Sequence, residues 1–136
     1  MSTPKVRIAV AGAGQIGKRH IEHILKNAEC TLSAIVDPMP AAMDFARTLG
    51  VPAHASLSDL FAQDRPDGVI IASPNQLHVD QALACIAAKV PTLVEKPVAH
   101  TLEAGVRLAE AAEAANVPVL VGTTAATARS WPRRSR

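Results

Sequence analysis

The residues that most clearly suggest chemistry are the glycines of the segment Gly12-Ala13-Gly14-Gln15-Ile16-Gly17. An apolar run precedes this segment, and apolar residues at helical spacing follow it. Between a strand and a helix, Gly12 would permit a tight turn, Gly14 would let the backbone approach a pyrophosphate, and Gly17 would let helix and strand pack closely. The phosphates would rest on the helix N-terminus, where backbone N–H groups and the helix dipole favour anions. The alternative is that the glycines serve only a tight turn.

Asp37 follows a second β-rich run and lies twenty positions beyond Gly17. Its carboxylate can accept hydrogen bonds from both hydroxyls of an adenosine ribose. The same charge would repel a 2′-phosphate, and the next residues, Pro38 and Met39, supply no arginine to bind one. The sequence therefore favours NAD over NADP. The other interpretation of Asp37 is an Asp-Pro turn and nothing more.

Two further polar loops end apolar runs, Ser73-Pro74-Asn75-Gln76-Leu77-His78 and Glu95-Lys96-Pro97. A Glu-Lys pair at the end of a buried strand is costly unless the charges are paired or used. Lys96 is therefore a candidate for polarising a substrate oxygen or for holding the nicotinamide ribose, and Glu95 could orient Lys96. Taken alone, either loop could equally be structural.

The elements that would position these loops alternate along the chain. Apolar runs predict strands over residues 6–11, 31–36, 53–54, 68–72, 92–95 and 118–121, and helical spacing predicts helices after the glycines and over 40–49, 56–62, 77–89 and 101–116. In the first helix we expect Ile21, Ile24, Leu25 and Ala28 to share one face. This alternation is typical of a single α/β domain with a doubly wound parallel sheet, the Rossmann fold, with strand order 3-2-1-4-5-6. All the polar loops would then meet at the carboxyl edge of the sheet.

Composition limits the remaining possibilities. The chain has 136 residues, 49% apolar and 2% aromatic, which suits one domain with a core of Ala, Val, Ile and Leu. The net charge of +2 comes from four arginines in the last eight residues, so the rest is slightly acidic and predicts no nucleic-acid surface. No apolar run is long enough for a membrane helix, and two cysteines suggest buried thiols in the cytoplasm. His20, His23, His54 and His100 have no metal-ligand spacing and are expected at the surface.

The GAGQIG loop, the SPNQLH stretch and the EKP triplet, in this order and spacing, resemble the glucose–fructose oxidoreductase/inositol dehydrogenase/MocA (Gfo/Idh/MocA) family over about residues 5–122. The resemblance implies hydride transfer between NAD(P) and a hydroxyl-bearing carbon, often of a sugar or cyclitol. It implies that the dinucleotide binds at Gly12, Gly14, Gln15, Ile16, Gly17 and Asp37, that its nicotinamide side meets Ser73, Pro74, Asn75 and His78, and that Glu95, Lys96 and Pro97 adjoin the reaction. Lys96 would lie beside the reacting carbon, as the catalytic residue. The alternative for His78 is a residue that caps its helix or faces solvent.

The chain departs from the family after residue 122. Family members continue into a substrate domain that supplies the general acid or base, whereas residues 123–136 do not resemble that continuation. Inserting one base after the Gly122 codon allows a family-like string, HHRRHSPLLAAAKP, so we interpret the basic tail as the product of a single-base deletion. The sequence then predicts a Rossmann domain at 1–122 without its substrate domain, inactive alone and able to self-associate through an exposed apolar surface. The competing hypotheses are a non-catalytic dinucleotide-binding module or redox sensor, and a small basic-tailed nucleic-acid binder.

Overall fold

The six strands form one parallel sheet in the order β3-β2-β1-β4-β5-β6, which confirms the predicted order. The computed structural model describes residues 5–95 and 102–122. The strands are β1 (Val6–Ala11), β2 (Cys30–Val36), β3 (Ala53–His54), β4 (Gly68–Ile71), β5 (Thr92–Glu95) and β6 (Val119–Gly122). The helices are α1 (Gln15–Lys26), α2 (Pro40–Leu49), α3 (Leu57–Gln63), the 3-10 turn η1 (Asn75–Leu77), α4 (His78–Ala87) and α5 (Leu102–Ala115).

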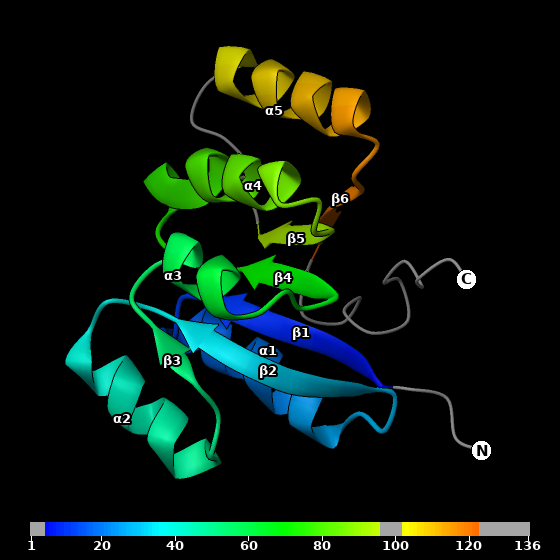
Figure 1. Cartoon of the computed structure of the whole chain (residues 1–136). Coiled ribbons are helices and arrows are strands. Elements are labelled where there is room, and N and C mark those ends of the chain that lie inside the picture. The colour runs from blue at the N-terminus through cyan, green and yellow to red at the C-terminus, as the bar shows by residue number, and fades with distance from the viewer. Residues whose placement is uncertain (1–4, 96–101, 123–136) are drawn as a thin grey trace.

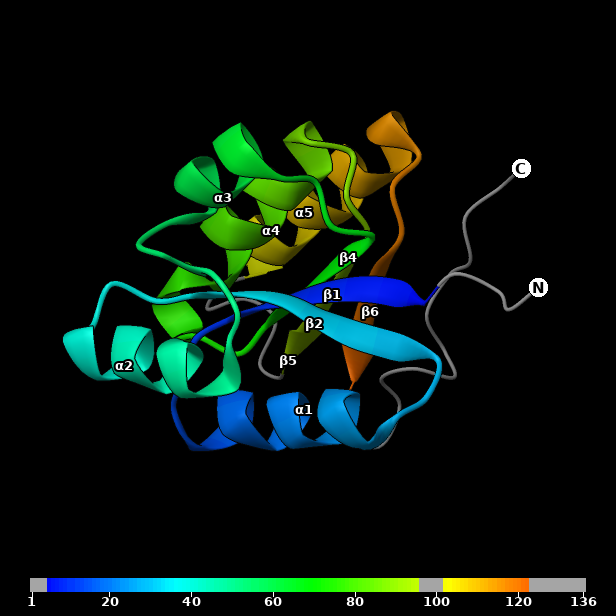
Figure 2. The ribbon, with the colours of Figure 1, turned by 60° about the horizontal axis from the view of Figure 1, so that its bottom comes forward.

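The sheet lies between two layers of helices. Figure 2 shows α1 and α2 on one face and α3, α4 and α5 on the other. Side chains alternate between the faces along each strand, so Ile8 and Val10 of β1 pack with α1, whereas Ala9 and Ala11 belong to the core beneath α3 and α4. A core with almost no aromatic residues is therefore filled by short branched side chains and alanines, as the composition indicates.

All strand ends that carry a polar loop meet at one edge. The arrowheads of β2, β4 and β5 point the same way in Figure 1, toward α2, and β1 is parallel to them. Because every β–α connection starts there, the loops after β1, β2 and β4 are neighbours in space although they are up to 60 residues apart in sequence. The edge is where a doubly wound sheet places its ligand.

Local sequence signals set most of the helix boundaries. The αL residue Gly50, with φ +70°, ends α2, and Ser56 caps α3 by accepting the Asp59 backbone N–H at 3.2 Å. The helix predicted from residue 77 begins one residue later, because Asn75–Leu77 form a 3-10 turn. It ends at Ala87 rather than at Lys89, which has a positive φ.

The inward face of α1 differs from the predicted one. Its buried residues are Gly17, His20, Ile21 and Ile24, whereas Leu25 is exposed. Ala28, also predicted on this face, is exposed and lies beyond the end of the helix at Lys26. The expectation that His20 lies at the surface is wrong: positions 17, 20, 21 and 24 follow the helical period, and the sheet lies along that face. His23, one step round the helix, is exposed as predicted.

Several predicted features lie outside the described residues. They are Lys96, Pro97, His100, the predicted helix start at residue 101 and the tail at 123–136. Within the described ranges, no helix combines the length and hydrophobicity needed to cross a membrane. Cys30 and Cys85 are both buried and form no disulfide, and burial raises the pKa of the Cys85 thiol to about 12.

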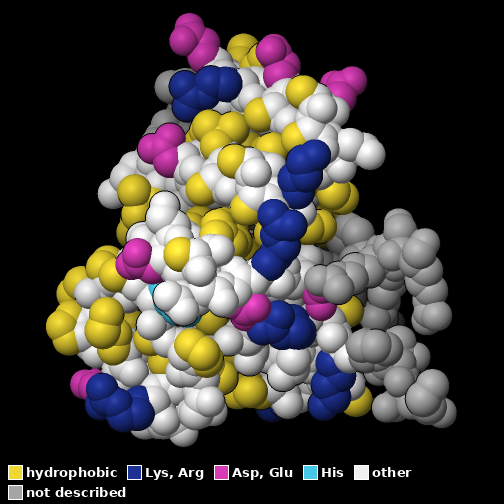
Figure 3. All heavy atoms as spheres, viewed as in Figure 1, with side chains coloured by type: hydrophobic (Ala, Val, Ile, Leu, Met, Phe, Trp, Pro, Cys, Tyr) yellow, Lys and Arg dark blue, Asp and Glu magenta, His cyan; other side chains and the backbone are white. Residues whose placement is uncertain are grey.

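Helix α5 is the least covered helix of the domain. Leu108 is its buried residue, whereas Leu102 is 84% exposed and Val106 is half-exposed. Figure 3 shows acidic side chains gathered over α5 and hydrophobic ones gathered at the far side of the same face, over α2. Self-association through an exposed apolar surface stays a prediction.

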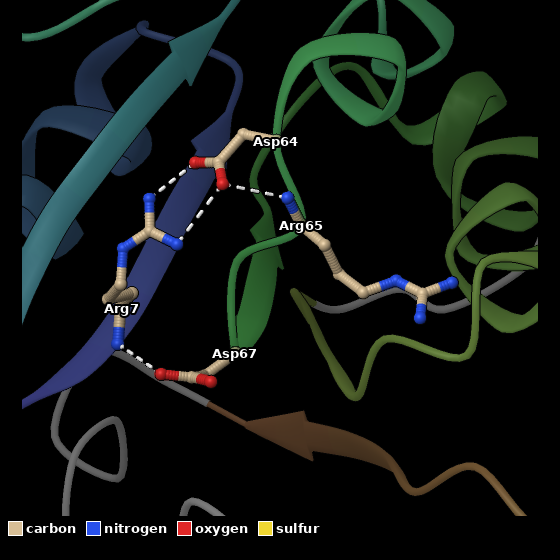
Figure 4. A network of polar contacts seen from close by, with 4 residues as sticks. All are labelled: Arg7, Asp64, Arg65 and Asp67. Carbon is tan, nitrogen blue, oxygen red and sulfur yellow. Dashed lines mark hydrogen bonds and ion pairs between the residues drawn. The ribbon is translucent and has the colours of Figure 1, made fainter.

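The opposite edge of the sheet is held by a clamp around Arg7 of β1 (Figure 4). Its guanidinium forms a two-pronged ion pair with Asp64, with one N–H···O distance of 3.2 Å. Its backbone N–H donates to the Asp67 carboxylate at 2.9 Å, and the Asp67 N–H donates back to the Arg7 carbonyl at 2.8 Å. The clamp fixes the segment between α3 and β4 to the start of β1.

The first prediction concerns this clamp. The Arg7 guanidinium lowers the pKa of Asp64, so the pair stabilises the fold above the usual carboxyl pKa and loses this effect as the pH falls through the lowered value. Arg7→Gln should therefore reduce the free energy of unfolding at neutral pH by at most about 1 kcal/mol, because the pair is partly exposed. The difference from the unchanged chain should shrink in acid.

Urea unfolding at several pH values measures both effects. Arg47→Gln is the matched control, because its ion pair with Asp44 is fully on the surface. A pH-independent difference between Arg7→Gln and the unchanged chain would contradict the electrostatic explanation.

Candidate cofactor-binding edge

The three glycines of the first loop have three separate structural roles. Gly12 has φ +99°, and a Cβ there would lie 2.7 Å from the Ala72 carbonyl carbon and from the Ser73 nitrogen. A Cβ on Gly17 would lie 2.8 Å from the Gly12 carbonyl carbon and still closer to its oxygen. A Cβ on Gly14 would meet nothing within 4 Å. Thus Gly12 and Gly17 are required by the fold, whereas Gly14 leaves open space.

That open space lies at the N-terminus of α1. Gly14 is the N-cap without any side-chain cap, and the first turn holds no acidic residue. Gly14, Gln15 and Ile16 are exposed. Helix N-termini carry partial positive charge and N–H groups without intrahelical acceptors, so this position suits an anionic group such as a pyrophosphate.

Asp37 connects the end of β2 to the glycine loop. One carboxylate oxygen, Oδ2, accepts the Ala13 backbone N–H at 2.9 Å, and the other, Oδ1, accepts the Met39 N–H at 2.9 Å. The turn expected from the Asp-Pro pair is therefore present, and the side chain does more than form it. Each carboxylate oxygen has lone-pair capacity left for another donor. Asp37 is half-buried beside the glycine loop and can still meet a ribose hydroxyl.

The loop after β4 is stabilised from inside by His78 and Gln81. His78 is only 1% exposed, and its Nε2–H donates to the Ser73 carbonyl oxygen at 2.8 Å. The Ser73 hydroxyl donates to Oε1 of Gln81, one turn further along α4. The alternative that His78 caps its helix or faces solvent is wrong, because the ring is buried beneath the loop. A role for His78 toward the cofactor stays a prediction.

Gln81 was not among the residues singled out from sequence. The only available signal was a polar residue on the inward side of a mostly apolar helix, one turn after His78. Pro74 is exposed and its carbonyl accepts the Leu77 N–H at 2.9 Å, which closes the turn. Asn75 begins this turn, and its side chain lies outside what the structure describes.

Glu95 is the last residue of β5, and its carboxylate bonds to a residue on α1. Its Oε1 meets Nε2 of His20, which is fully buried, while Glu95 itself is 13% exposed. Burial lowers the pKa of His20 and outweighs the opposite effect of Glu95. The Nε2–H donates to the Glu95 carboxylate oxygen. The expectation that Glu95 orients Lys96 stays a prediction, since Lys96 lies outside the described residues.

The structure thus brings most of the predicted residues to one edge. The glycine loop contacts the start of the loop after β4. Asp37 is bonded to the glycine loop, and Glu95 is bonded to α1, the helix that follows this loop. In the described ranges, no three His, Cys, Asp or Glu side chains gather as a metal site would require. The edge offers a helix N-terminus, a half-buried carboxylate and backbone polar groups, which is a set suited to a dinucleotide.

Comparison with known proteins is decisive at this point. The sequence profile of an oxidoreductase family with an NAD-binding Rossmann fold, Gfo/Idh/MocA, matches residues 6–123. The chain belongs to this family. Inositol 2-dehydrogenase of Leifsonia xyli is 37% identical over 111 residues, which cover 80% of this chain and 33% of that protein. This Gfo/Idh/MocA chain spans about a third of the length of the curated relatives it matches.

Two of the similar solved structures were determined with NAD(H) or NADH bound. The WlbA dehydrogenase from Bordetella pertussis, in complex with NADH and UDP-GlcNAcA, has a TM-score of 0.84 and 34% identity and covers 88% of this chain and 37% of its own. The scyllo-inositol dehydrogenase from Lactobacillus casei, with bound NAD(H) and scyllo-inositol, has a TM-score of 0.82 and 26% identity, covering 88% and 36%. The Gfo/Idh/MocA chain described here is an NAD-binding domain of this kind.

The second prediction separates the roles of two glycines. Gly17→Ala should lower the free energy of unfolding by about 1–3 kcal/mol or prevent folding, because its Cβ would collide with the Gly12 carbonyl. Gly14→Ala should cost less than about 1 kcal/mol, the scale of a weakened cap, because its Cβ enters open space.

Gly14→Ala should nevertheless weaken NAD binding, since its methyl group occupies the space the phosphates need. Urea unfolding and calorimetric titration with NAD measure the two quantities. Equal loss of stability in the two variants would show that the glycine roles are not divided in this way.

Proposed function

We propose that this chain forms the cofactor half of an oxidoreductase that transfers hydride between NAD and a hydroxyl-bearing carbon, with a sugar or cyclitol as substrate. The observation that carries the proposal is the edge at which Asp37, bonded to Ala13, stands beside the open N-terminus of α1. The substrate class follows from the inositol dehydrogenases among the relatives. In the oxidative direction, hydride leaves the carbinol carbon for the nicotinamide, and the hydroxyl proton goes to a general base.

The adenosine side is assigned to Asp37 and the glycine loop. Gly12 and Gly17 shape the loop, Gly14, Gln15 and Ile16 receive the pyrophosphate, and Asp37 accepts the ribose hydroxyls. A carboxylate at this point disfavours a 2′-phosphate by charge repulsion. NAD is therefore the proposed cofactor in preference to NADP.

The nicotinamide side is assigned to the loops after β4 and β5, with Ser73, Pro74, Asn75, His78, Glu95, Lys96 and Pro97 as its residues. His78 and the Ser73–Gln81 bond hold the first of these loops in one shape. Lys96 is the proposed catalytic residue, because a cation beside the reacting oxygen would stabilise the charge that develops there.

The Rossmann domain proposed here, residues 1–122, supplies binding and orientation. The proton-transferring group and most of the substrate pocket are assigned to the part of the relatives that this chain does not match. We also propose the cytoplasm as its location, because the two cysteines are buried and form no disulfide.

The third prediction tests cofactor choice. Asp37→Ala should weaken NAD binding by roughly ten- to a hundredfold, the value of a hydrogen bond to a charged group. NADP binding should change less, because removing the carboxylate also removes a repulsion. The ratio of the two affinities is the measurement, since loss of the Ala13 bond loosens the loop for both cofactors alike. Equal losses for NAD and NADP would refute the assignment.

The fourth prediction concerns activity. The purified chain should bind NAD and turn over no member of a panel of sugars and cyclitols. Losing a general base alone removes about 10²–10⁴ of rate, and losing substrate positioning removes more. Absorbance of NADH follows turnover, and titration follows binding. Turnover near about one per second, the low end of ordinary enzyme rates, would refute this division of labour.

A further inference from the structure

We propose that His20 is a positioning residue that ties the phosphate-binding helix α1 to the end of β5 and so sets the nicotinamide side of the site. The proposal rests on the NAD-binding function proposed above and extends it to a residue that does not itself touch the cofactor. The observation behind it is the bond between His20 Nε2 and Glu95 Oε1, which joins residues 75 positions apart.

The pair lies where packing alone would favour apolar residues. Leu93, two residues before Glu95 on the same face of β5, belongs to the core cluster that also holds Ile21 and Ile24 of α1. Two polar side chains at the end of such a face lose hydration, and a well-packed apolar pair of similar volume would stabilise the fold as well or better. Stability therefore does not explain the pair, whereas a demand for one defined geometry does.

The geometry it defines is the position of α1 against the sheet. Gly17 fixes the first turn of α1 against the Gly12 carbonyl and Ala72, at the ends of β1 and β4. His20 lies one turn later on the same face and reaches β5. With contacts at both places, α1, which would receive the phosphates, and β5, which precedes Lys96 in the sequence, are held in one position relative to each other.

The orientation of the Glu95 side chain matters because Glu95 directly precedes Lys96 and Pro97 in the sequence. The bond to α1 keeps the Glu95 side chain on the α1 side of the sheet at the last residue of β5. At the same residue, β5 still pairs with β6 through Gly122. Without that bond, the Glu95 carboxylate would be more stable in contact with water, and the end of β5 would have more than one arrangement available.

The test compares NAD with ADP-ribose, which has the same adenosine and pyrophosphate but no nicotinamide. His20→Leu keeps a similar volume and removes the donor. It should weaken NAD about tenfold while ADP-ribose affinity stays within about twofold, the loss expected when one hydrogen-bonded arrangement is no longer enforced. His20→Gln places an amide donor near the original Nε2 and should restore most of the NAD affinity.

His23→Leu is the matched control, because His23 lies on the same helix with an exposed side chain. It should leave both affinities unchanged. Circular dichroism and thermal unfolding establish that each variant is folded, and His20→Gln carries the comparison if His20→Leu does not fold: it should then keep the ratio of NAD to ADP-ribose affinity of the unchanged chain.

Four outcomes would overturn the inference. Equal losses of NAD and ADP-ribose affinity in His20→Leu would indicate general loosening of the domain, and equal behaviour of the Leu and Gln variants would show that the hydrogen bond is irrelevant. Equal affinity of the unchanged chain for NAD and ADP-ribose would leave no nicotinamide contact for the pair to organise. Failure of the unchanged chain to bind either ligand would overturn the proposed function and this inference with it, and is distinguished from the other three by that measurement alone.

Discussion

The close approach of α1 to the strand ends is the constraint on which the rest of the structure depends. There is no room for a Cβ at Gly17, because the Gly12 carbonyl occupies that space, and none at Gly12, because the backbone of Ala72 and Ser73 does. Backbone therefore meets backbone at the junction of β1, β4 and α1. An N-terminus held this rigidly can present its N–H groups to an anion without first being ordered, which lowers the entropic cost of binding.

Side chains from β2 and β5 are bonded to this junction or to the helix that starts there. Asp37 reaches it from β2 through the Ala13 N–H, and Glu95 reaches it from β5 through His20. The loop after β4 touches it directly and is held in shape by His78 and Gln81 from within α4. The loops after β2 and β4 and the last residue of β5, all distant in sequence, are thus fixed to one strand–loop–helix unit.

How far sequence could lead depended on the range of each interaction. The sheet order, the role of Gly17 and the bounds of α2 follow from the order of elements and from local patterns, and the structure has them as predicted. Helix α3 lies one residue later than predicted, at Leu57–Gln63, because Ser56 is its N-cap. The position of His20 on the helical period of Gly17, Ile21 and Ile24 indicates burial. Its residue type does not, because a histidine has no fixed preference for the interior. Its partner, Glu95, could not be predicted, because a hydrogen bond between residues 75 positions apart leaves no local sequence pattern. Gln81 had only a weak local signal, a polar residue on the inward side of a mostly apolar helix, and its bond to Ser73 spans eight positions.

Two carboxylates at opposite ends of the edge show how one fold treats similar charges differently. Asp37 is half-exposed and bonded to backbone N–H groups, so its oxygens keep capacity for a ligand. Glu95 is largely buried and bonded to the His20 imidazole, so its orientation is fixed. The first arrangement suits a group that recognises a hydroxyl directly, and the second suits a group that holds its own strand in place. The difference arises from position relative to α1: Asp37 stands beside the loop that begins the helix, whereas Glu95 lies under the helix itself.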